Sequence, residues 1–285
     1  MTKTLISFGH GYSAAALTKQ LLALGWTVFG TTRSADKAEA IRETGVMPVL
    51  LDNEADARIQ DALTHATHLL ISAGPNESGD PTLRRFKHLI VAAKHLEWVG
   101  YLSTTGVYGD HQGGWVDENT PLTPTTKRGK WRVTAEQEWQ AIPGLPLHIF
   151  RLAGIYGPGR GPFTKVRNGT ARRIIKENQV FSRIHVEDIA QVLRASIERP
   201  NPGAVYNVCD DFAAPPEDVI THAAELLGLP IPPAIPFEDA EMTAMARSFY
   251  AEAKRVRNDR IKDDLGVTLK YPDYRTGLAA LVSDR

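Results

Sequence analysis

The chain has 285 residues, of which 42% are hydrophobic, so it can bury a substantial core in one large α/β domain or in one domain with a smaller appendage. Lys+Arg and Asp+Glu number 33 each, which excludes a global field that would attract nucleic acid or a membrane surface, and any phosphate binding must be local. The chain has a single cysteine, no cysteine or histidine spacing typical of zinc, and no apolar stretch near the ~18 residues that a membrane span needs. We therefore expect a cytoplasmic protein without metal, membrane or nucleic-acid partners.

Short apolar runs alternate with longer helical patterns over the first 153 residues. The runs of strand length are TLISFG, TVFGTTR, MPVLLD, HLLISAG, VGYLSTT and LHIFRLA. The helical patterns cover 14–24, 35–44, 54–66 and 82–96. This alternation predicts an α/β fold with a Rossmann-type, doubly wound parallel sheet covered by helices on both faces.

The composition of the sequence changes after Ala153. GIYGPGRGPF is rich in turn residues, a short helix is expected over 187–198, and proline-rich segments follow. We therefore expect a dinucleotide-binding domain over residues 1–153 and a smaller C-terminal substrate lobe over 154–285. Within that lobe, residues 184–199 are expected to pack back on the first domain.

The clearest chemical signal is the sequence ISFGHGYSAAAL. Gly9, Gly11 and Ala14 have the G-x-G-x-x-G/A spacing directly after an expected strand and at the start of an expected helix. The first glycine allows a tight turn, the second lets backbone amides approach a pyrophosphate, and the small third residue lets helix and strand pack closely. The predicted cofactor site includes Tyr12 and Ser13, at the helix N-terminus that would face the anion. A glycine turn that binds no ligand is the alternative.

The end of the second expected strand reads GTTRSADK. NAD-specific sites usually have an acid here that binds the ribose 2′-hydroxyl, whereas this chain has Thr32, Arg33 and Lys37. Arg33 suits a 2′-phosphate, so we expect NADP in preference to NAD, with NAD remaining possible. A solvated arginine at a strand end is the alternative.

The order GHGYSA, TTRS, LLD, ISAGP, STTGVYG, RLAGIYGPGR, RIHVEDIA and VYNV resembles the extended and atypical short-chain dehydrogenase/reductases of the NAD-dependent epimerase/dehydratase family. The resemblance is strongest to the atypical branch that includes the YeeZ-like proteins. It implies that Asp52 contacts the adenine and that Ser72, Ala73 and Gly74 line the cofactor. It also implies that Thr104 is the family's catalytic Ser or Thr, which hydrogen-bonds the reacting oxygen.

The resemblance also implies a Tyr-x-x-x-Lys pair on the helix that follows. The corresponding stretch of this chain, TPTTKRGKWRVTAEQE, departs from that pattern. Anchored on TAEQ, the tyrosine position falls on Arg128 and the lysine position on Arg132, and a shifted register pairs Thr126 with Lys130. Neither register supplies a tyrosine. A guanidinium stays protonated, so Arg128 cannot exchange a proton with substrate, although it could stabilise oxyanion charge.

A proton donor would then have to come from elsewhere in the chain. The candidates are Tyr108, Lys130, Tyr156 and His185, and each is more readily explained as a structural residue. For His185 we favour packing at a strand end.

Basic residues gather between 160 and 183, where Glu177 is the lone acid. They are Arg160, Lys165, Arg167, Arg172, Arg173, Lys176 and Arg183. The family holds nucleotide-sugar phosphates in this region, so we expect a small anionic substrate, and a solvated helix face or a subunit contact is the alternative.

Two functions remain open. One is an NAD(P)-dependent oxidoreductase or epimerase-like enzyme that acts on an anionic hydroxyl or carbonyl substrate, such as a nucleotide sugar. The other is a non-catalytic dinucleotide-binding sensor or regulatory protein. Either would be a monomer or a homodimer.

Overall fold

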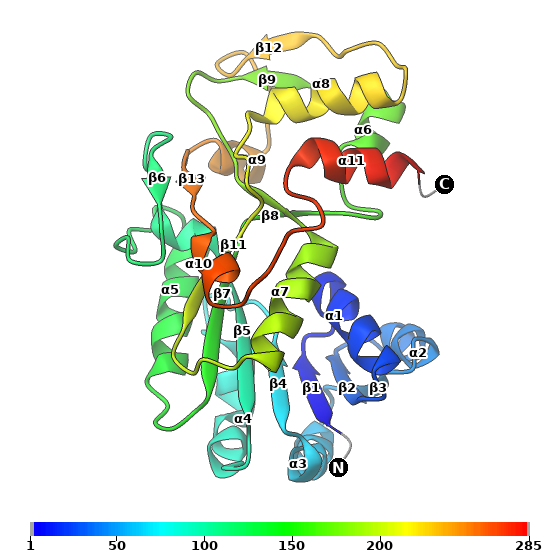
Figure 1. The fold of residues 1–285 in the computed structure, drawn as a ribbon, viewed down its shortest axis with the longest axis vertical. Helices are drawn as coiled ribbons and strands as arrows, with labels where there is room; N and C mark the ends of the chain where they lie inside the picture. The colour runs from blue at the N-terminus through cyan, green and yellow to red at the C-terminus, as the bar shows by residue number, and fades with distance from the viewer. Residues whose placement is uncertain (1–2, 284–285) are drawn as a thin grey trace. The chain divides into compact units, whose positions relative to one another are not determined.

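The computed structural model describes residues 3–283, which form two compact units (Figure 1). The first unit comprises the chain up to residue 104 together with 130–151 and 189–206, and the second comprises 105–129, 152–188 and the chain from 207 onward. Each unit is thus assembled from three segments that interleave along the sequence. The expected functional boundary at residue 153 stays a prediction.

A seven-stranded parallel sheet forms the frame of the first unit, in the order β11-β7-β5-β4-β1-β2-β3. Its strands are β1 (Thr4–Phe8), β2 (Thr27–Thr32), β3 (Met47–Leu50), β4 (His68–Ile71), β5 (Trp98–Thr104), β7 (Leu147–Leu152) and β11 (Val205–Val208). The Rossmann-type α/β fold is therefore confirmed, and β11 is added to the six expected strands. The strand order reverses between β1 and β4, and in open α/β sheets ligands bind outside the carboxyl ends of the strands at such a point.

The helices that follow the first strands are α1 (Tyr12–Ala23), α2 (Ala35–Glu43), α3 (Ala55–His65) and α4 (Pro81–Ala92). All four were predicted, with ends that differ by at most four residues. Helix α4 starts at Pro81 because the buried carboxylate of Asp80 accepts the backbone N–H groups of Thr82 and Leu83 at 2.9 and 3.0 Å. Helices α5 (Lys127–Gln140) and α7 (Val186–Glu198) follow later in the chain.

One face of the sheet packs against α3, α4 and α5. Its core includes Phe8, Tyr101 and Trp139, each at most 1% exposed, and burial of each such side chain contributes about 1.5–3 kcal/mol. Phe29 of β2 packs against the same cluster. Because side chains alternate along a strand, the neighbouring Gly30 and then Thr32 belong to the opposite face.

The second unit is built from short elements. It contains the 3₁₀ turn η1 (Thr105–Tyr108), the strand pairs β6/β13 (Trp115–Val116, Arg255–Val256), β8/β10 (Gly154–Tyr156, Arg183–His185) and β9/β12 (Arg173–Ile175, Ala234–Pro236), and the helices α6 (Phe163–Arg167), α8 (Pro216–Leu226), α9 (Ala244–Phe249), α10 (Asp259–Asp263) and α11 (Tyr274–Ser283). The thiol of Cys209 is fully buried in this unit and donates to the carbonyl of Val256 at 3.2 Å.

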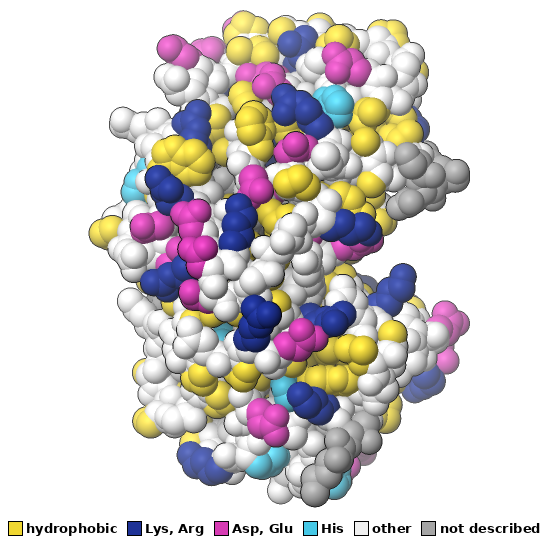
Figure 2. Space-filling view, in the orientation of Figure 1, with side chains coloured by type: hydrophobic (Ala, Val, Ile, Leu, Met, Phe, Trp, Pro, Cys, Tyr) yellow, Lys and Arg dark blue, Asp and Glu magenta, His cyan; other side chains and the backbone are white. Residues whose placement is uncertain are grey.

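Charged side chains of both signs are intermixed on the face drawn in Figure 2, in keeping with the equal numbers of acidic and basic residues. Between residues 3 and 283, no helix has the length and apolar character needed to cross a bilayer.

Candidate functional site

The loop between β1 and α1 has the shape that its sequence predicts. Gly9 adopts a φ of +81°, and a Cβ at this position would lie 2.7 Å from the backbone N of Ala73, so only glycine fits. Its N–H donates to Thr31 Oγ1 at 2.7 Å. The N–H groups of Ser72 and Ala73 donate to the carbonyl of Phe8 at 2.8 and 2.9 Å, which holds the loop after β4 beside the glycine turn.

Gly11 meets a different requirement. It caps α1 in an extended conformation without a side-chain cap, and a Cβ here would come no closer than 4.0 Å to a neighbouring atom. Packing within the protein therefore does not require glycine at this position, whereas a ligand that approaches the backbone would. No side chain caps the start of this twelve-residue helix, where backbone N–H groups can bind a phosphate. Buried Ser13 and Ala14 bring α1 close to the sheet, and Tyr12 is partly exposed.

The end of β2 presents a free cation. Arg33 is exposed and forms no hydrogen bond or ion pair within residues 3–283. The hydroxyl of Thr32 accepts the N–H of Ser34 at 3.3 Å, and the Ser34 hydroxyl in turn caps α2 by accepting the N–H of Lys37 at 3.3 Å. This arrangement, with Arg33 free beside it, is suited to a phosphate group.

Asp52, the residue expected to contact adenine, is exposed and follows β3. Its carboxylate accepts the N–H of Glu54 at 3.0 Å and forms an ion pair with Arg58. Arg85 donates to the Asp52 carbonyl at 2.6 Å. The side chain of Asp52 therefore orders the turn into α3, and its role toward adenine stays a prediction.

Arg132 of α5 reaches the end of β5. Its Nη1 donates to the Leu102 carbonyl at 2.8 Å and to the Tyr101 hydroxyl at 3.0 Å, and the guanidinium lies over the Tyr101 ring with its Cζ 5.4 Å from the ring centroid. A Cβ at Gly74 would be 3.2 Å from Nη2. Two predicted site residues, Gly74 and Arg132, thus lie side by side.

This guanidinium also acts on the pKa values of buried groups around it. Burial raises the pKa of the Asp80 carboxyl and of the Tyr101 hydroxyl, and the charge of Arg132 lowers both. A fixed positive charge is therefore part of the wall of this site.

A buried ion pair lies one turn further along α5. Glu136 pairs with Arg151 of β7, with Nη2 and Oε2 2.8 Å apart, and it also accepts the hydroxyl of Ser103, the neighbour of Thr104. The two charged side chains are only 2% and 6% exposed. The network fixes α5 against the carboxyl ends of β5 and β7. Sequence analysis did not identify it, because Glu136 belongs to a helix that is polar on most of its surface.

Thr104 ends β5 and is partly exposed, as a hydroxyl that meets a substrate should be. Arg128 lies one turn before Arg132 on α5, is exposed, and has no hydrogen bond or ion pair within the described chain. An arginine at this position supplies a cation and hydrogen-bond donors, and it has no exchangeable proton near neutral pH.

Three of the four alternative proton donors have structural roles in the second unit. The Tyr108 hydroxyl is buried and donates to Asn207 Oδ1 at 2.7 Å. The Tyr156 hydroxyl donates to the Asp273 carbonyl at 3.3 Å, and burial raises its pKa. His185 is 1% exposed, with ring centroids 5.2 Å from Tyr156 and 4.0 Å from Tyr271, which confirms the expected packing role. The fourth candidate, Lys130, is exposed.

The basic segment of the second unit divides into two groups. Arg183 is engaged, because it donates to the carbonyls of Phe181 and Ala214 at 2.8 and 3.0 Å, and Lys176 binds the Tyr250 carbonyl. The exposed members are Arg160, Lys165, Arg167 and Arg172. Arg173 is partly exposed, and its Nε is buried without a hydrogen-bond partner in the described chain.

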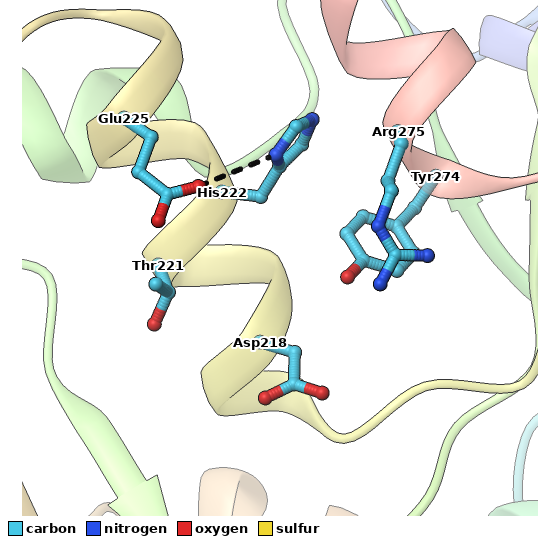
Figure 3. Close-up of a pocket in the computed structure, with 6 residues that line it drawn as sticks. All are labelled: Asp218, Thr221, His222, Glu225, Tyr274 and Arg275. Carbon is cyan, nitrogen blue, oxygen red and sulfur yellow. Dashed lines mark ion pairs between the residues drawn. The ribbon is translucent and has the colours of Figure 1, made fainter.

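A small open pocket of about 190 Å³ lies between α8 and α11 of the second unit (Figure 3). Its walls are polar, and they are formed by Asp218, Thr221, His222, Glu225, Tyr274 and Arg275. Within the described residues, no group of three or more His, Cys, Asp or Glu side chains is placed to hold a metal ion.

Comparison with known proteins extends through both units. The model of the NAD dependent epimerase/dehydratase family matches residues 5–209. Protein YeeZ of Escherichia coli strain K12 is 31% identical over 281 residues, which cover 95% of this chain and 97% of YeeZ. A 3-diazoavenalumate denitrifying reductase from a Streptomyces species is 27% identical over 308 residues, which cover 97% of this chain and 99% of the reductase. The solved structure of a functionally unknown conserved protein from Silicibacter pomeroyi DSS is 62% identical, covers 99% of each chain and superposes with a TM-score of 0.94.

Proposed function

Because the chain belongs to the NAD-dependent epimerase/dehydratase family, and is thus an NAD(P)-binding, epimerase-like protein, we propose that it is an NADP(H)-dependent oxidoreductase that lacks the family's catalytic tyrosine. Its substrate is a small anionic molecule with a hydroxyl or carbonyl group, such as a nucleotide sugar. The observation that carries this proposal is Gly11, whose missing Cβ leaves open space at an uncapped helix N-terminus.

The cofactor assignment follows from the two ends of the site. The pyrophosphate binds the N–H groups at the start of α1, where the helix dipole also favours an anion. The 2′-phosphate of NADP(H) binds Arg33, which is exposed and has no partner in the described chain. When bound, the nicotinamide ring supplies or accepts the hydride.

The chain's own residues hold the reacting groups. Arg132 keeps Nη2 beside Gly74, where it can donate to a ribose hydroxyl, which is the role that the family gives to lysine. Thr104 hydrogen-bonds the reacting oxygen of the substrate. Arg128 stabilises negative charge that develops on that oxygen, and the proton comes from solvent or from the substrate itself.

Titration calorimetry with NADP(H) and NAD(H) tests the cofactor assignment. Hydrogen bonds to a charged group contribute about 1.5–3 kcal/mol, so Arg33→Ala should lower NADP(H) affinity about tenfold or more and leave NAD(H) affinity unchanged. The control is Arg42→Ala, another exposed arginine that follows β2 on α2. Equal affinities for both dinucleotides in the parent protein would remove the NADP preference.

The basic segment of the second unit is assigned to the anionic substrate. Charge reversal of Arg172 and Arg173 should weaken the binding of a nucleoside diphosphate and leave dinucleotide affinity unchanged, because Gly11 and Arg33 belong to the first unit. Reversal at partly exposed Arg194 and exposed Arg199 of the first unit provides the matched control. If neither affinity changes, the segment is a solvated surface.

A second candidate function is a non-catalytic dinucleotide sensor, and the arginine at the tyrosine position favours it. The two functions differ in turnover. A panel of anionic hydroxyl and carbonyl compounds such as nucleotide sugars, followed by nicotinamide absorbance, should give a slow but measurable change with an enzyme. A sensor would bind the dinucleotide tightly and leave every compound unchanged.

A further inference from the structure

The pocket between α8 and α11 (Figure 3) lies within the second unit and contains none of the residues assigned to the proposed function. Its volume of about 190 Å³ equals that of about six water molecules at ~30 Å³ each, which is room for a compact polar molecule. Tyr274 and Arg275 line it from α11. The other lining residues have the i, i+3, i+4 and i+7 spacing of one face of α8, and they are Asp218, Thr221, His222 and Glu225.

The hydroxyl of Tyr274 is available to a ligand in this pocket. Tyr274 is only 2% exposed, yet its hydroxyl has no hydrogen-bond partner in the described chain. In Figure 3 the hydroxyl points from α11 toward α8. Burial raises the pKa of this hydroxyl, the charge of Arg275 lowers it and the charge of Asp218 raises it. Because buried tyrosine hydroxyls usually find a partner, a bound molecule would complete this one.

Arg275 is a cation that is held in place without a counter-charge. Its Cζ lies 4.7 Å from the centroid of the Tyr274 ring and 5.2 Å from that of the Phe212 ring. It has no hydrogen bond or ion pair between residues 3 and 283, so its N–H groups can bind a planar anion such as a carboxylate. The stability of α11 does not explain this cation, since a positive charge in the first turn opposes the helix dipole.

The α8 wall of the pocket presents hydrogen-bond acceptors. Asp218 is exposed and has no hydrogen bond or ion pair in the described chain. The Thr221 hydroxyl donates to the Glu217 carbonyl at 2.9 Å, so toward a ligand it can only accept. Glu225 has a neighbour, because its Oε2 lies 3.6 Å from His222 Nδ1. Asp218 is therefore the acid of this wall that is left for a ligand.

We propose that this pocket binds a small zwitterion of the amino-acid class, with its carboxylate on Arg275 and Tyr274 and its ammonium group on Asp218. A simple anion would be repelled by the two acids of α8, and a simple cation would be repelled by Arg275. No ion pair joins Asp218 to Arg275 in the described chain, so a molecule that carries both charges pairs with both. The site goes beyond the proposed function and does not depend on the dinucleotide.

NMR titration of the full chain, observed on the ligand, tests the proposal with glycine, β-alanine and γ-aminobutyrate, in which the two charges are increasingly far apart. Acetate and methylammonium are the matched controls, because each keeps one charged half of glycine. Exposed ion pairs are screened by water, so we expect at least one amino acid to bind about three- to tenfold more tightly than either control. Binding of acetate or methylammonium as tightly as every amino acid would overturn the proposal, as would no detectable binding of any of the three amino acids.

Variants of the two charged residues locate the binding. Arg275→Gln and Asp218→Asn should each lower the affinity for the amino acid about three- to tenfold. The control is Arg257→Gln, an exposed arginine outside the pocket whose Cζ lies 5.5 Å from the Trp115 ring centroid. Unchanged binding in both pocket variants would overturn the proposal. Dinucleotide affinity, measured separately, should stay the same in every variant, since Gly11 and Arg33 belong to the first unit.

Tyr274→Phe separates binding from folding. The variant keeps the ring under Arg275 and removes only a hydroxyl that has no partner in the described chain. The urea midpoint should therefore not fall, whereas affinity for the amino acid should fall about threefold or more. A lower midpoint with unchanged affinity would show that the hydroxyl serves the fold and would refute its role in the site.

Discussion

Replacing Glu136 with glutamine should destabilise the first unit by about 3–5 kcal/mol, because the change removes the carboxylate that pairs with the buried guanidinium of Arg151. Glutamine keeps the volume of the side chain, so the loss reports charge and hydrogen bonding and not a cavity. The carboxylate is 2% exposed and has two partners, Arg151 and Ser103. The expected loss is a large part of the 5–15 kcal/mol that is typical of a folded domain.

Urea unfolding followed by tryptophan fluorescence measures this loss as a lower transition midpoint. The matched control is Glu54→Gln, whose carboxylate is 83% exposed and 3.5 Å from Arg58, and which should cost at most ~1 kcal/mol. A loss of unfolding free energy in Glu136→Gln no larger than in Glu54→Gln would refute the idea that the Glu136–Arg151 pair is shielded from water and holds α5 against β5 and β7.

Two further predictions concern the cofactor loop and the helix position where the family's catalytic tyrosine is expected. Gly11→Ala should lower dinucleotide affinity tenfold or more in calorimetry and change the free energy of unfolding by at most ~1 kcal/mol. Gly9→Ala, in contrast, should destabilise the protein, because an added Cβ would lie 2.7 Å from the Ala73 N and the φ of Gly9 is +81°. Loss of stability in both variants would contradict the distinct roles of the two glycines. The double variant Arg128→Tyr with Arg132→Lys should gain hydride transfer to a small carbonyl, measured by nicotinamide absorbance, and the parent should show none. The reason is that a general acid raises the reaction rate about 100- to 10,000-fold. Robust turnover by the parent that persists in Arg128→Ala would show that another group donates the proton.

The sequence was sufficient for the fold because its signals are local. Strand-length apolar runs and glycine or proline punctuation set the order of the first strands and helices, and the G-x-G-x-x-A spacing located the turn at Gly9. The strand β11 was missed because VYNV follows the turn residues RPNPG in the part of the chain after Ala153, where the sequence was expected to form a separate lobe.

Contacts between distant segments could not be predicted in the same way. The sequence placed Arg132 on a helix, but its bonds to Tyr101 and Leu102 depend on how α5 packs on β5. The contact between Glu136 and Arg151, fifteen positions later, likewise depends on how α5 packs against β7.

The buried thiol of Cys209 makes the two units separately observable during unfolding. Cys209 is the only cysteine and lies in the second unit, whereas four of the five tryptophans, Trp26, Trp98, Trp131 and Trp139, lie in the first. Alkylation of the thiol, measured by mass, reports opening of the second unit, and indole emission reports mainly the first. Coincident transitions would mean that the interleaved segments make the molecule one cooperative system, and separated transitions would give each unit its own free energy.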